Sequence, residues 1–214
     1  MGEVLFEVRV CINPQCGLRY TIEVGQVLGV HCPSCRSATE VVGVPYGQME
    51  IPEAHSGLPE RAMRIEVLLD NIRSAWNVGS IFRAADGAGV AHVHLCGVCP
   101  KPDQAKVAKT ALGAERSIAS TYHPNGVQAC QRLKDAGFRL WALEGGQRAE
   151  SIYIEGAQDD RPLLLVVGNE VSGVDPEILA LCERVICLPM LGTKGSLNVA
   201  VAFGIAIYTL RFGG

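Results

Sequence analysis

The stretch LPMLGTKGSLNVAVAFGIAIY, Leu188–Tyr208, decides the fold. From Leu197 on it is apolar at almost every position, so the sequence predicts a helix over 197–210 that is buried on all sides. We expect a strand to end at Leu188–Met190, a glycine-rich loop to follow, and Ser196 to cap the helix. Such a loop offers backbone groups to a small polar ligand, and Leu188 with Leu197 offers an apolar slot for a flat ring.

Short β-branched runs alternate with helical patterns in the sequence that leads up to this stretch. The runs between residues 64 and 190 are RIEVLLD, AHVHLCG, FRLWALE, PLLLVVG and RVICLPM. Alternation of this kind is typical of a mostly parallel sheet with helices on its faces. The sequence therefore predicts an α/β fold whose ligands bind at the carboxyl edge of the sheet.

Composition excludes some classes of protein and leaves others open. No run of 18 or more apolar residues occurs, and the first residues lack the pattern of a signal peptide, so we expect a cytoplasmic protein without a membrane span. The net charge of -3 gives no global sign of a nucleic-acid binder. Nine cysteines in such a compartment favour metal ligands or free thiols over disulfides.

The first 60 residues differ from the rest of the chain. They hold four of the nine cysteines and end in a segment with several prolines and glycines, VPYGQMEIPEAHSGLPE. Prolines and glycines of this density are typical of linkers. We therefore predict a small domain over 1–44, a linker over 45–60 and the α/β domain over 61–214.

Two close cysteine pairs, fifteen residues apart, stand in the small domain: Cys11 and Cys16, then Cys32 and Cys35. This spacing suits a tetrahedral structural zinc, and the segment resembles a zinc ribbon. The first pair is looser than the commonest knuckle, so His31 stays a candidate substitute ligand, and four ordinary thiols are the alternative. Cys96 and Cys99 have no partner pair, and we interpret them as core thiols.

The segment DNIRSAWNVGSIFRAADGAGV, Asp70–Val90, predicts a helix that packs on the sheet. Its apolar positions recur at helical spacing: Val78, Ile81, Phe82, Ala85 and Gly89. Arg83 then points away from the sheet, and Asn77 stands where an N-cap belongs. The plainer interpretation is that Asn77 only caps the helix and that Arg83 pairs with Asp86 on a solvated face.

A buried strand in PLLLVVGNEVSGVDPEIL ends at Gly168. Gly168 and Gly173 let a ligand approach the main chain, and Glu170 lies between them. The plainer interpretation is a glycine turn before a helix that Asp175 caps, with Pro176 at its first position. The pattern is not a G-x-G-x-x-G fingerprint, so it does not favour a nicotinamide cofactor.

Three motifs in this order, NVGSIFRAADGAGV, GNEVSG and the opening stretch, resemble the SpoU or TrmH-like branch of the SPOUT RNA methyltransferases. KVAKTALGAE, Lys106–Glu115, resembles the segment usual between the first two, and the match covers about residues 62–213. The resemblance implies a deep trefoil knot at the C-terminus. It also implies S-adenosylmethionine as cofactor, and a homodimer whose second protomer covers the apolar helix. The zinc ribbon lies outside the resemblance.

The resemblance also assigns residues, motif position by motif position. The cofactor would be held by Gly168, Leu188, Met190 and Leu197. The reactive site would comprise Asn77, Arg83, Glu170, Ser196 and Asn198. The implied reaction is attack of a ribose 2′-hydroxyl of tRNA or rRNA on the methyl group of the cofactor. Arg83 would inherit the role of activator; because a guanidinium stays protonated, positioning the hydroxyl or a nearby phosphate is easier for it than acting as a base.

Two other classes of function are compatible with the fold. One is an RNA-binding protein that keeps the fold without catalysis, against which the presence of all five polar motif residues argues. The other is an adaptor built around the zinc ribbon, which leaves the three motifs unexplained. The resemblance therefore implies an RNA 2′-O-methyltransferase, and the cysteine spacing predicts a zinc that is structural.

Overall fold

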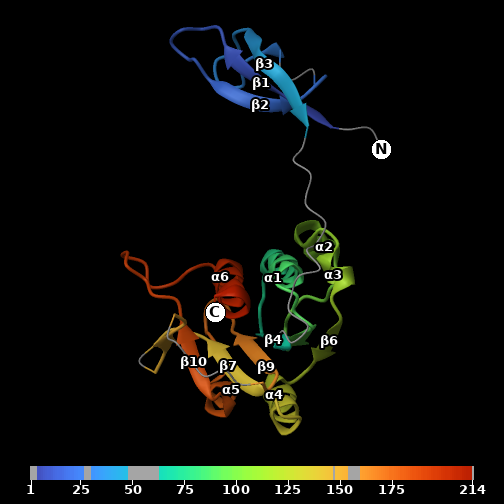
Figure 1. Cartoon of the computed structure of the whole chain (residues 1–214), viewed down its shortest axis with the longest axis vertical. Helices are drawn as coiled ribbons and strands as arrows, with labels where there is room; N and C mark the ends of the chain where they lie inside the picture. Colours follow the sequence, from blue (N-terminus) through green and yellow to red (C-terminus); the bar gives the residue numbers. More distant parts are fainter. Residues whose placement is uncertain (1–3, 27–29, 48–62, 147, 154–159, 214) are drawn as a thin grey trace. The chain divides into compact units, whose positions relative to one another are not determined.

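A computed structural model describes residues 4–26, 30–47, 63–146, 148–153 and 160–213. The chain divides into two compact units, Met1–Leu58 and Pro59–Gly214, each of which is described by itself (Figure 1). Among the described residues, no helix is long and apolar enough to span a membrane.

The first unit is a three-stranded antiparallel sheet with β1 (Leu5–Cys11) between β2 (Arg19–Glu23) and β3 (Thr39–Gly47). β1 ends on a cysteine, and the turns that follow β1 and precede β3 carry the other three cysteines of the pairs. β3 continues to Gly47, so residues 45–47 of the predicted linker belong to the sheet. The rest of that linker, 48–60, lies outside the described residues.

The second unit is built on a sheet with the strand order β6-β5-β4-β9-β7-β10-β8, in which every neighbouring pair is parallel. The strands are β4 (Ile65–Asp70), β5 (His92–Cys96), β6 (Ser120–His123), β7 (Arg139–Leu143), β8 (Glu150–Ser151), β9 (Leu163–Val167) and β10 (Arg184–Cys187). The helices are α1 (Ala75–Gly87), α2 (Ala105–Ala111), α3 (Ala114–Ser117), α4 (Gly126–Asp135), α5 (Pro176–Leu181) and α6 (Val199–Phe212). The predicted α/β class is confirmed, and the short strands β6 and β8 are additions to the five predicted runs.

Helices cover both faces of this sheet (Figure 1). Alternate residues of β4 face opposite ways, as the pleat requires. Ile65, Val67 and Leu69 belong to the core that contains the buried sides of α1 and α6, whereas Leu68 belongs to the core beneath α4 and α5. Both cores lie on β4 and β9, which are buried at every position. These near-continuous apolar strands leave the polar loops at the carboxyl edge of the sheet.

The start of α6 differs from the prediction. The helix begins at Val199, and Asn198 caps it by accepting hydrogen bonds from the N–H groups of Ala200 and Val201. The predicted cap, Ser196, lies two residues earlier in an exposed loop. The predicted strand end at Leu188–Met190 is also wrong, because β10 stops at Cys187.

The prediction that this helix is buried on all sides is wrong for the single chain. Phe203, Ala206 and Ile207 are fully buried against the sheet. An apolar stripe faces outward at the spacing of one helical face, and its members are between 39% and 55% exposed: Val201, Ile205, Tyr208 and Phe212. We call this set the α6 stripe. The trefoil knot and the covering protomer stay predictions.

The helix α1 begins two residues before Asn77, so the prediction that Asn77 is the N-cap is wrong. Ser74 caps α1, and its hydroxyl oxygen accepts a hydrogen bond from the N–H of Asn77. The predicted apolar face is buried apart from Gly89, which lies beyond the helix end and is exposed. Asn77 therefore sits in the first turn with its side chain free for other contacts.

Candidate active site and metal centre

The carboxyl ends of β7, β9 and β10 border a cavity of about 360 Å³. Its lining comprises residues 143–145, 167–171, 173, 187–188, 190, 195–199 and 202. All four predicted cofactor residues line it: Gly168, Leu188, Met190 and Leu197. Three predicted reactive residues line it as well: Glu170, Ser196 and Asn198. The second and third motifs, which are separated by 14 residues in the sequence, therefore form one site.

The loop after β9 is folded tightly on itself, and two glycines make this fold feasible. A Cβ at Gly168 would lie 2.3 Å from backbone atoms of Gly173 and Val174, so only glycine fits there. Gly173 has a φ of +74°, in the left-handed region that favours glycine. The backbones of Asn169 and Gly173 exchange two hydrogen bonds of 3.0 Å, which leaves Glu170 near the tip of the loop.

Glu170 is held by three donors from the start of α1. Its carboxylate accepts hydrogen bonds from the N–H groups of Arg73 and Ser74, both 3.1 Å, and from the side-chain amide of Asn77 at 2.9 Å. Burial opposes ionisation of this carboxyl, but these hydrogen bonds outweigh it and hold the pKa of Glu170 below its usual value. The positive end of the helix dipole favours the same charge. Glu170 is therefore an ionised orienting group.

The hydrogen bonds fix the orientation of two amide side chains. Because the oxygen of Asn198 accepts from two backbone N–H groups at the start of α6, its amide nitrogen must face Asn77. That nitrogen donates to the oxygen of Asn77 at 3.1 Å, and the nitrogen of Asn77 then donates to Glu170. Each amide keeps one N–H for a ligand. The first and third motifs are thus joined at the rim of the cavity.

Arg83 is not brought together with these residues in the single chain. It lines a separate open hollow of about 550 Å³ beside α1, α2 and α3, together with Asp86, residues 111–114, Arg116 and Ser117. Of the five predicted reactive residues, Asn77, Glu170, Ser196 and Asn198 converge, and Arg83 stands apart. Its predicted exposure is confirmed, and no ion pair with Asp86 occurs among the described residues.

Sequence reasoning missed Glu144, a second carboxylate in the cavity lining. It follows β7 directly, accepts a hydrogen bond from the N–H of Val174 at 2.9 Å, and so supports the loop that carries Glu170. The sequence LWALEGG does contain a signal for this residue, because it places an acidic side chain at the end of a buried strand. The sequence alone does not say that β7 lies beside β9, which is what brings Glu144 to the site.

The cavity suits an elongated ligand with a flat ring and a positive charge. The cavity lining includes apolar side chains suitable for contact with a heteroaromatic ring: Leu143, Leu188, Met190, Leu197 and Ala202. Glu144 and Glu170 also line the cavity and bring two carboxylates to the same site. S-adenosylmethionine has both features, an adenine ring and a cationic sulfonium, so the residues present fit this cofactor.

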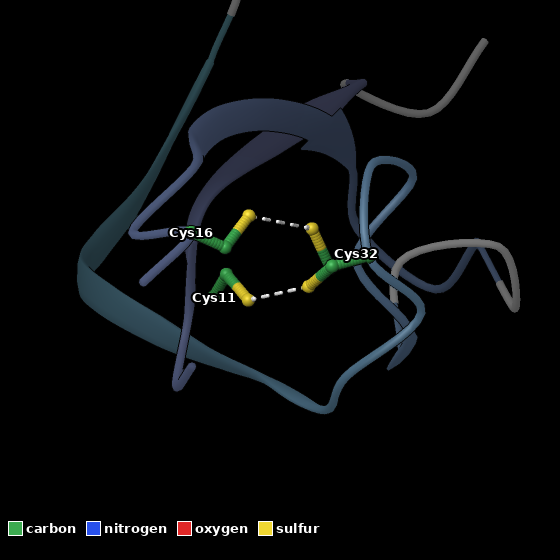
Figure 2. Close-up of side chains that lie close together, drawn as sticks. Cys11, Cys16 and Cys32 are labelled. Atoms are coloured by element: carbon green, nitrogen blue, oxygen red, sulfur yellow. Dashed lines mark hydrogen bonds between the residues drawn. The ribbon is translucent and has the colours of Figure 1, made fainter. Parts of the chain in front are cut away.

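The four paired cysteines form one cluster in the first unit (Figure 2). Their sulfur atoms all lie within 4.8 Å of one another; Cys11 and Cys35 are 3.4 Å apart, and Cys16 and Cys32 are 3.7 Å apart. Sulfur ligands at about 2.3 Å from a tetrahedral zinc are separated by roughly 3.8 Å. The cluster therefore has the donor set and the dimensions of a structural zinc site.

The remaining candidates for metal ligands do not join this cluster. His31 is not a member of it and pairs through its backbone with Ala38. Cys96 and Cys99 are buried beside β4, and burial raises the pKa of Cys96 to about 12 and that of Cys99 to about 11. Both therefore stay protonated thiols at neutral pH, which agrees with their interpretation as core residues.

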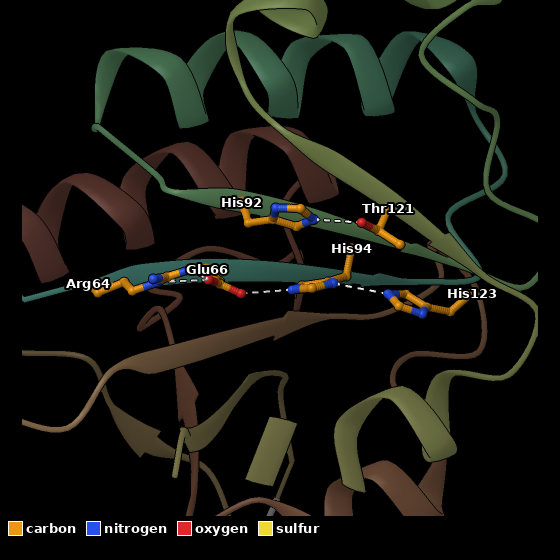
Figure 3. Close-up of polar contacts among 6 residues, drawn as sticks. All are labelled: Arg64, Glu66, His92, His94, Thr121 and His123. Carbon is orange, nitrogen blue, oxygen red and sulfur yellow. Dashed lines mark hydrogen bonds and ion pairs between the residues drawn. The ribbon is translucent and has the colours of Figure 1, made fainter. Parts of the chain in front are cut away.

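A row of histidines crosses the sheet on the side of α4 (Figure 3). Glu66 on β4 contacts His94 on β5 at 2.8 Å, and His94 contacts His123 on β6 at 3.0 Å. The guanidinium of Arg132 lies 3.5 Å from the other ring nitrogen of His123. One choice of tautomers satisfies all three contacts, with each ring donor pointing toward Glu66. None of the residues in this row lines the cavity.

Comparisons with known proteins agree with this geometry. The model of the SpoU rRNA methylase family matches residues 64–208. A tRNA (guanosine(18)-2′-O)-methyltransferase from Aquifex aeolicus is 32% identical over 71% of this chain and 70% of its own length. The 23S rRNA (guanosine-2′-O-)-methyltransferase RlmB from Vibrio vulnificus is 30% identical over 77% of this chain and 65% of its own length.

Solved structures show the same fold. The AdoMet-bound rRNA methyltransferase from Sinorhizobium meliloti superposes with a TM-score of 0.64 at 26% identity, over 69% of this chain and 56% of its own. The family match begins where β4 begins and ends within α6, so it contains every element that borders the cavity. By sequence and by fold, the chain belongs to the SpoU rRNA methylase family.

Proposed function

We propose that this protein is an S-adenosylmethionine-dependent methyltransferase that acts on the 2′-hydroxyl of a ribose in tRNA or rRNA. The observation that carries the proposal is that the second and third family motifs line one cavity, and that the Glu170–Asn77–Asn198 hydrogen bonds join the start of the first motif to them. When bound, the cofactor supplies an electrophilic methyl group.

The residues around the cavity would have two roles: some bind the cofactor, and others orient the reacting groups. Leu188, Met190 and Leu197 would hold the adenine ring by apolar contact, and the backbone of Gly168, which also lines the cavity, would contact the ligand. Glu170 fixes Asn77, and Asn77 fixes Asn198, so the spare N–H of each amide is presented in a defined direction. Pre-set donors of this kind can orient a ribose oxygen or stabilise charge that develops on it.

The proton of the hydroxyl needs an acceptor other than Glu170. Glu170 is a weak base because its pKa is lowered, and three donors already occupy its oxygens. Arg83 is permanently protonated and lies in the neighbouring hollow. We assign Arg83 to binding a phosphate or the hydroxyl of the RNA, and the proton to an RNA phosphate or water.

A homodimer would complete this arrangement. The α6 stripe exposes four large apolar side chains in a row, as an interface helix does. The loop 191–198, of which residues 195–198 line the cavity, is exposed throughout and lies directly before this helix. A second protomer seated on the stripe would cover both the helix and part of the open site.

The cysteine cluster would hold one structural zinc. Four sulfur ligands close the coordination shell of a tetrahedral zinc, which leaves no position for a substrate or a water. A single three-stranded sheet of this size buries too little apolar surface to be stable without a metal or a similar cross-link. The first unit would therefore fold around the metal and take no part in methyl transfer.

The proposal is tested by mapping 2′-O-methylated riboses in total RNA from cells with and without the gene. The expected result is the loss of methylation at one or a few positions of tRNA or rRNA in the deletion strain. An unchanged map, from cells shown to express the protein, would favour the rival function of RNA binding without catalysis.

A further inference from the structure

We propose that the outward side of α1 and α2 binds a single-stranded segment of the RNA substrate, with a base stacked on Trp76. We call this region the α1–α2 surface; it comprises Trp76, Arg83, Lys106, Lys109, Leu112 and Arg116. The inference rests on the proposed function, since it takes RNA as the substrate, and it adds where that RNA lies.

The first argument is the exposure of Trp76. Its side chain is 50% exposed in the first turn of α1, although tryptophan is usually largely buried. Asn77, the next residue, belongs to the hydrogen-bonded rim of the cavity. An exposed aromatic ring one residue from the reactive site is well placed to stack a nucleotide next to the target, and such stacking tolerates any base.

The second argument is the distribution of charge. The ammonium of Lys109 on α2 lies 5.5 Å from the centre of the Trp76 ring. Arg83 lies seven residues after Trp76, which places it on the same face of α1 about 10 Å away. Lys106 and Arg116 are exposed as well. Cations beside an exposed ring form the combination that binds a single-stranded nucleic-acid backbone.

Two acidic residues lie close to these cations and do not cancel them. The side chain of Glu115 is only 7% exposed, accepts a hydrogen bond from the N–H of Gly113 at 2.9 Å, and lies 3.6 Å from Arg116. Asp86 shares the hollow with Arg83. Four basic side chains therefore face two acidic ones on this surface, although the whole chain has a net charge of -3. The local excess of positive charge matches a polyanion.

The third argument is that the surface is rigid before RNA arrives. A Cβ at Gly79 would lie 2.4 Å from the carbonyl oxygen of Val107, so α1 and α2 touch backbone to backbone. The hydroxyl of Thr110 donates to the carbonyl of Trp76 at 3.3 Å and ties α2 to the first turn of α1. The backbone positions that carry Trp76 and Lys109 are thus held in fixed relation, which lowers the entropic cost of binding.

The fourth argument is a strained leucine at the far end of the surface. Leu112 has a φ of +53° and its side chain is 66% exposed in the hollow that Arg83 and Arg116 border. A branched side chain in the left-handed region is costly, and such strain concentrates at functional sites. Here it adds an apolar side chain to a hollow that two arginines also line, a combination suited to a ribose or base with its flanking phosphates.

The experiment measures binding of a short fluorescein-labelled oligouridylate to the full-length protein by fluorescence anisotropy. We expect Trp76→Ala to raise the Kd by roughly 5- to 100-fold and Trp76→Phe to keep most of the affinity, since phenylalanine still offers a ring face. Lys109→Ala should lower the slope of log Kd against log salt by about 0.7, the value of one phosphate contact. Tyr153→Ala and Lys134→Ala are matched controls outside the surface, and they should change neither quantity.

A second readout separates this inference from the proposed function. In methyl transfer to cellular RNA, Trp76→Ala should raise the KM for RNA while the affinity for S-adenosylmethionine stays unchanged. Transfer with an unaltered KM and Kd in Trp76→Ala would overturn the α1–α2 surface and leave the activity intact. RNA binding that depends on Trp76, without methyl transfer, would overturn the activity and leave the surface intact. The proposed α1–α2 surface would also be excluded if the wild type did not bind the oligonucleotide. It would be excluded as well if Trp76→Ala changed the oligomeric mass and left the Kd unchanged.

Discussion

At the scale of single residues, the site depends on side chains that have both a structural and a chemical contact. Asn198 caps α6 through its oxygen and orients Asn77 through its nitrogen. The two contacts use different atoms, so substitutions can separate them. The same is true of Asn77, whose oxygen and nitrogen face Asn198 and Glu170.

Asn198→Asp and Asn198→Ala should have different effects on stability and the same effect on activity. Aspartate keeps the oxygen that caps α6, so we expect little change in the free energy of unfolding, whereas alanine should cost about 1 kcal/mol. Both lose the N–H that faces Asn77, so both should lower kcat by about tenfold or more. Urea unfolding and methyl-transfer kinetics measure the two effects; full activity in Asn198→Asp would contradict the orienting role.

The histidine row predicts a pH dependence of stability. Burial and neighbouring positive charge lower the pKa of His123, and burial likewise lowers the pKa of His92, whose ring centre lies 4.5 Å from that of His94. Below their unfolded pKa of about 6.5, the unfolded chain binds more protons, so stability is lost as pH falls. Glu66, whose pKa is lowered by His94 and Arg64 despite burial, adds a loss near and below its unfolded pKa of about 4.3.

The matched variant for this prediction is His123→Gln, which keeps a donor toward His94 but cannot be protonated. We expect the free energy of unfolding to fall less steeply between about pH 7 and 5 in this variant than in the wild type. Denaturant unfolding at several pH values measures the slopes. If stability fell equally steeply with pH in the variant and the wild type, protonation of His123 would not be coupled to folding.

At the scale of elements, the cysteine turns should be the metal-dependent part of the chain. Metal analysis of purified protein should find about one zinc per chain, which Cys32→Ser with Cys35→Ser should remove. Cys96→Ser with Cys99→Ser is the matched control and should retain it, because those buried thiols lie outside the cluster. Stoichiometric zinc in the first double variant would exclude this assignment.

How far the sequence predicted the elements depends on how local each signal was. The buried strands β4 and β9 and the apolar face of α1 follow from runs and spacings within a few residues, and they were predicted. The caps of α1 and α6 were misplaced because a cap depends on backbone angles, and Ser74 and Asn198 compete with nearby Asn77 and Ser196. Glu144 and the separation of Arg83 from the cavity depend on strand order and helix packing, which no local pattern reports.

At the scale of the whole molecule, the α6 stripe predicts association. Sedimentation at micromolar concentration should give twice the mass of one chain. Ile205→Glu with Tyr208→Glu should give monomers, since it places charge in the middle of the stripe. Val44→Glu, at an exposed apolar position in the first unit, should leave the dimer unchanged. A monomeric wild type that still binds S-adenosylmethionine would contradict the proposed role of the second protomer.

The central claim is methyl transfer to a ribose oxygen, and the most direct test follows a labelled methyl group from S-adenosylmethionine into unmodified cellular RNA. Digestion to nucleosides should yield a 2′-O-methylated ribose. Arg83→Ala should slow transfer by about 100-fold with little change in cofactor affinity, because Arg83 lies outside the cofactor cavity. Arg83→Lys should restore only part of the rate, since an ammonium lacks the planar fork of a guanidinium. Label found on a base in place of a ribose, or undiminished transfer by Arg83→Ala, would contradict the account.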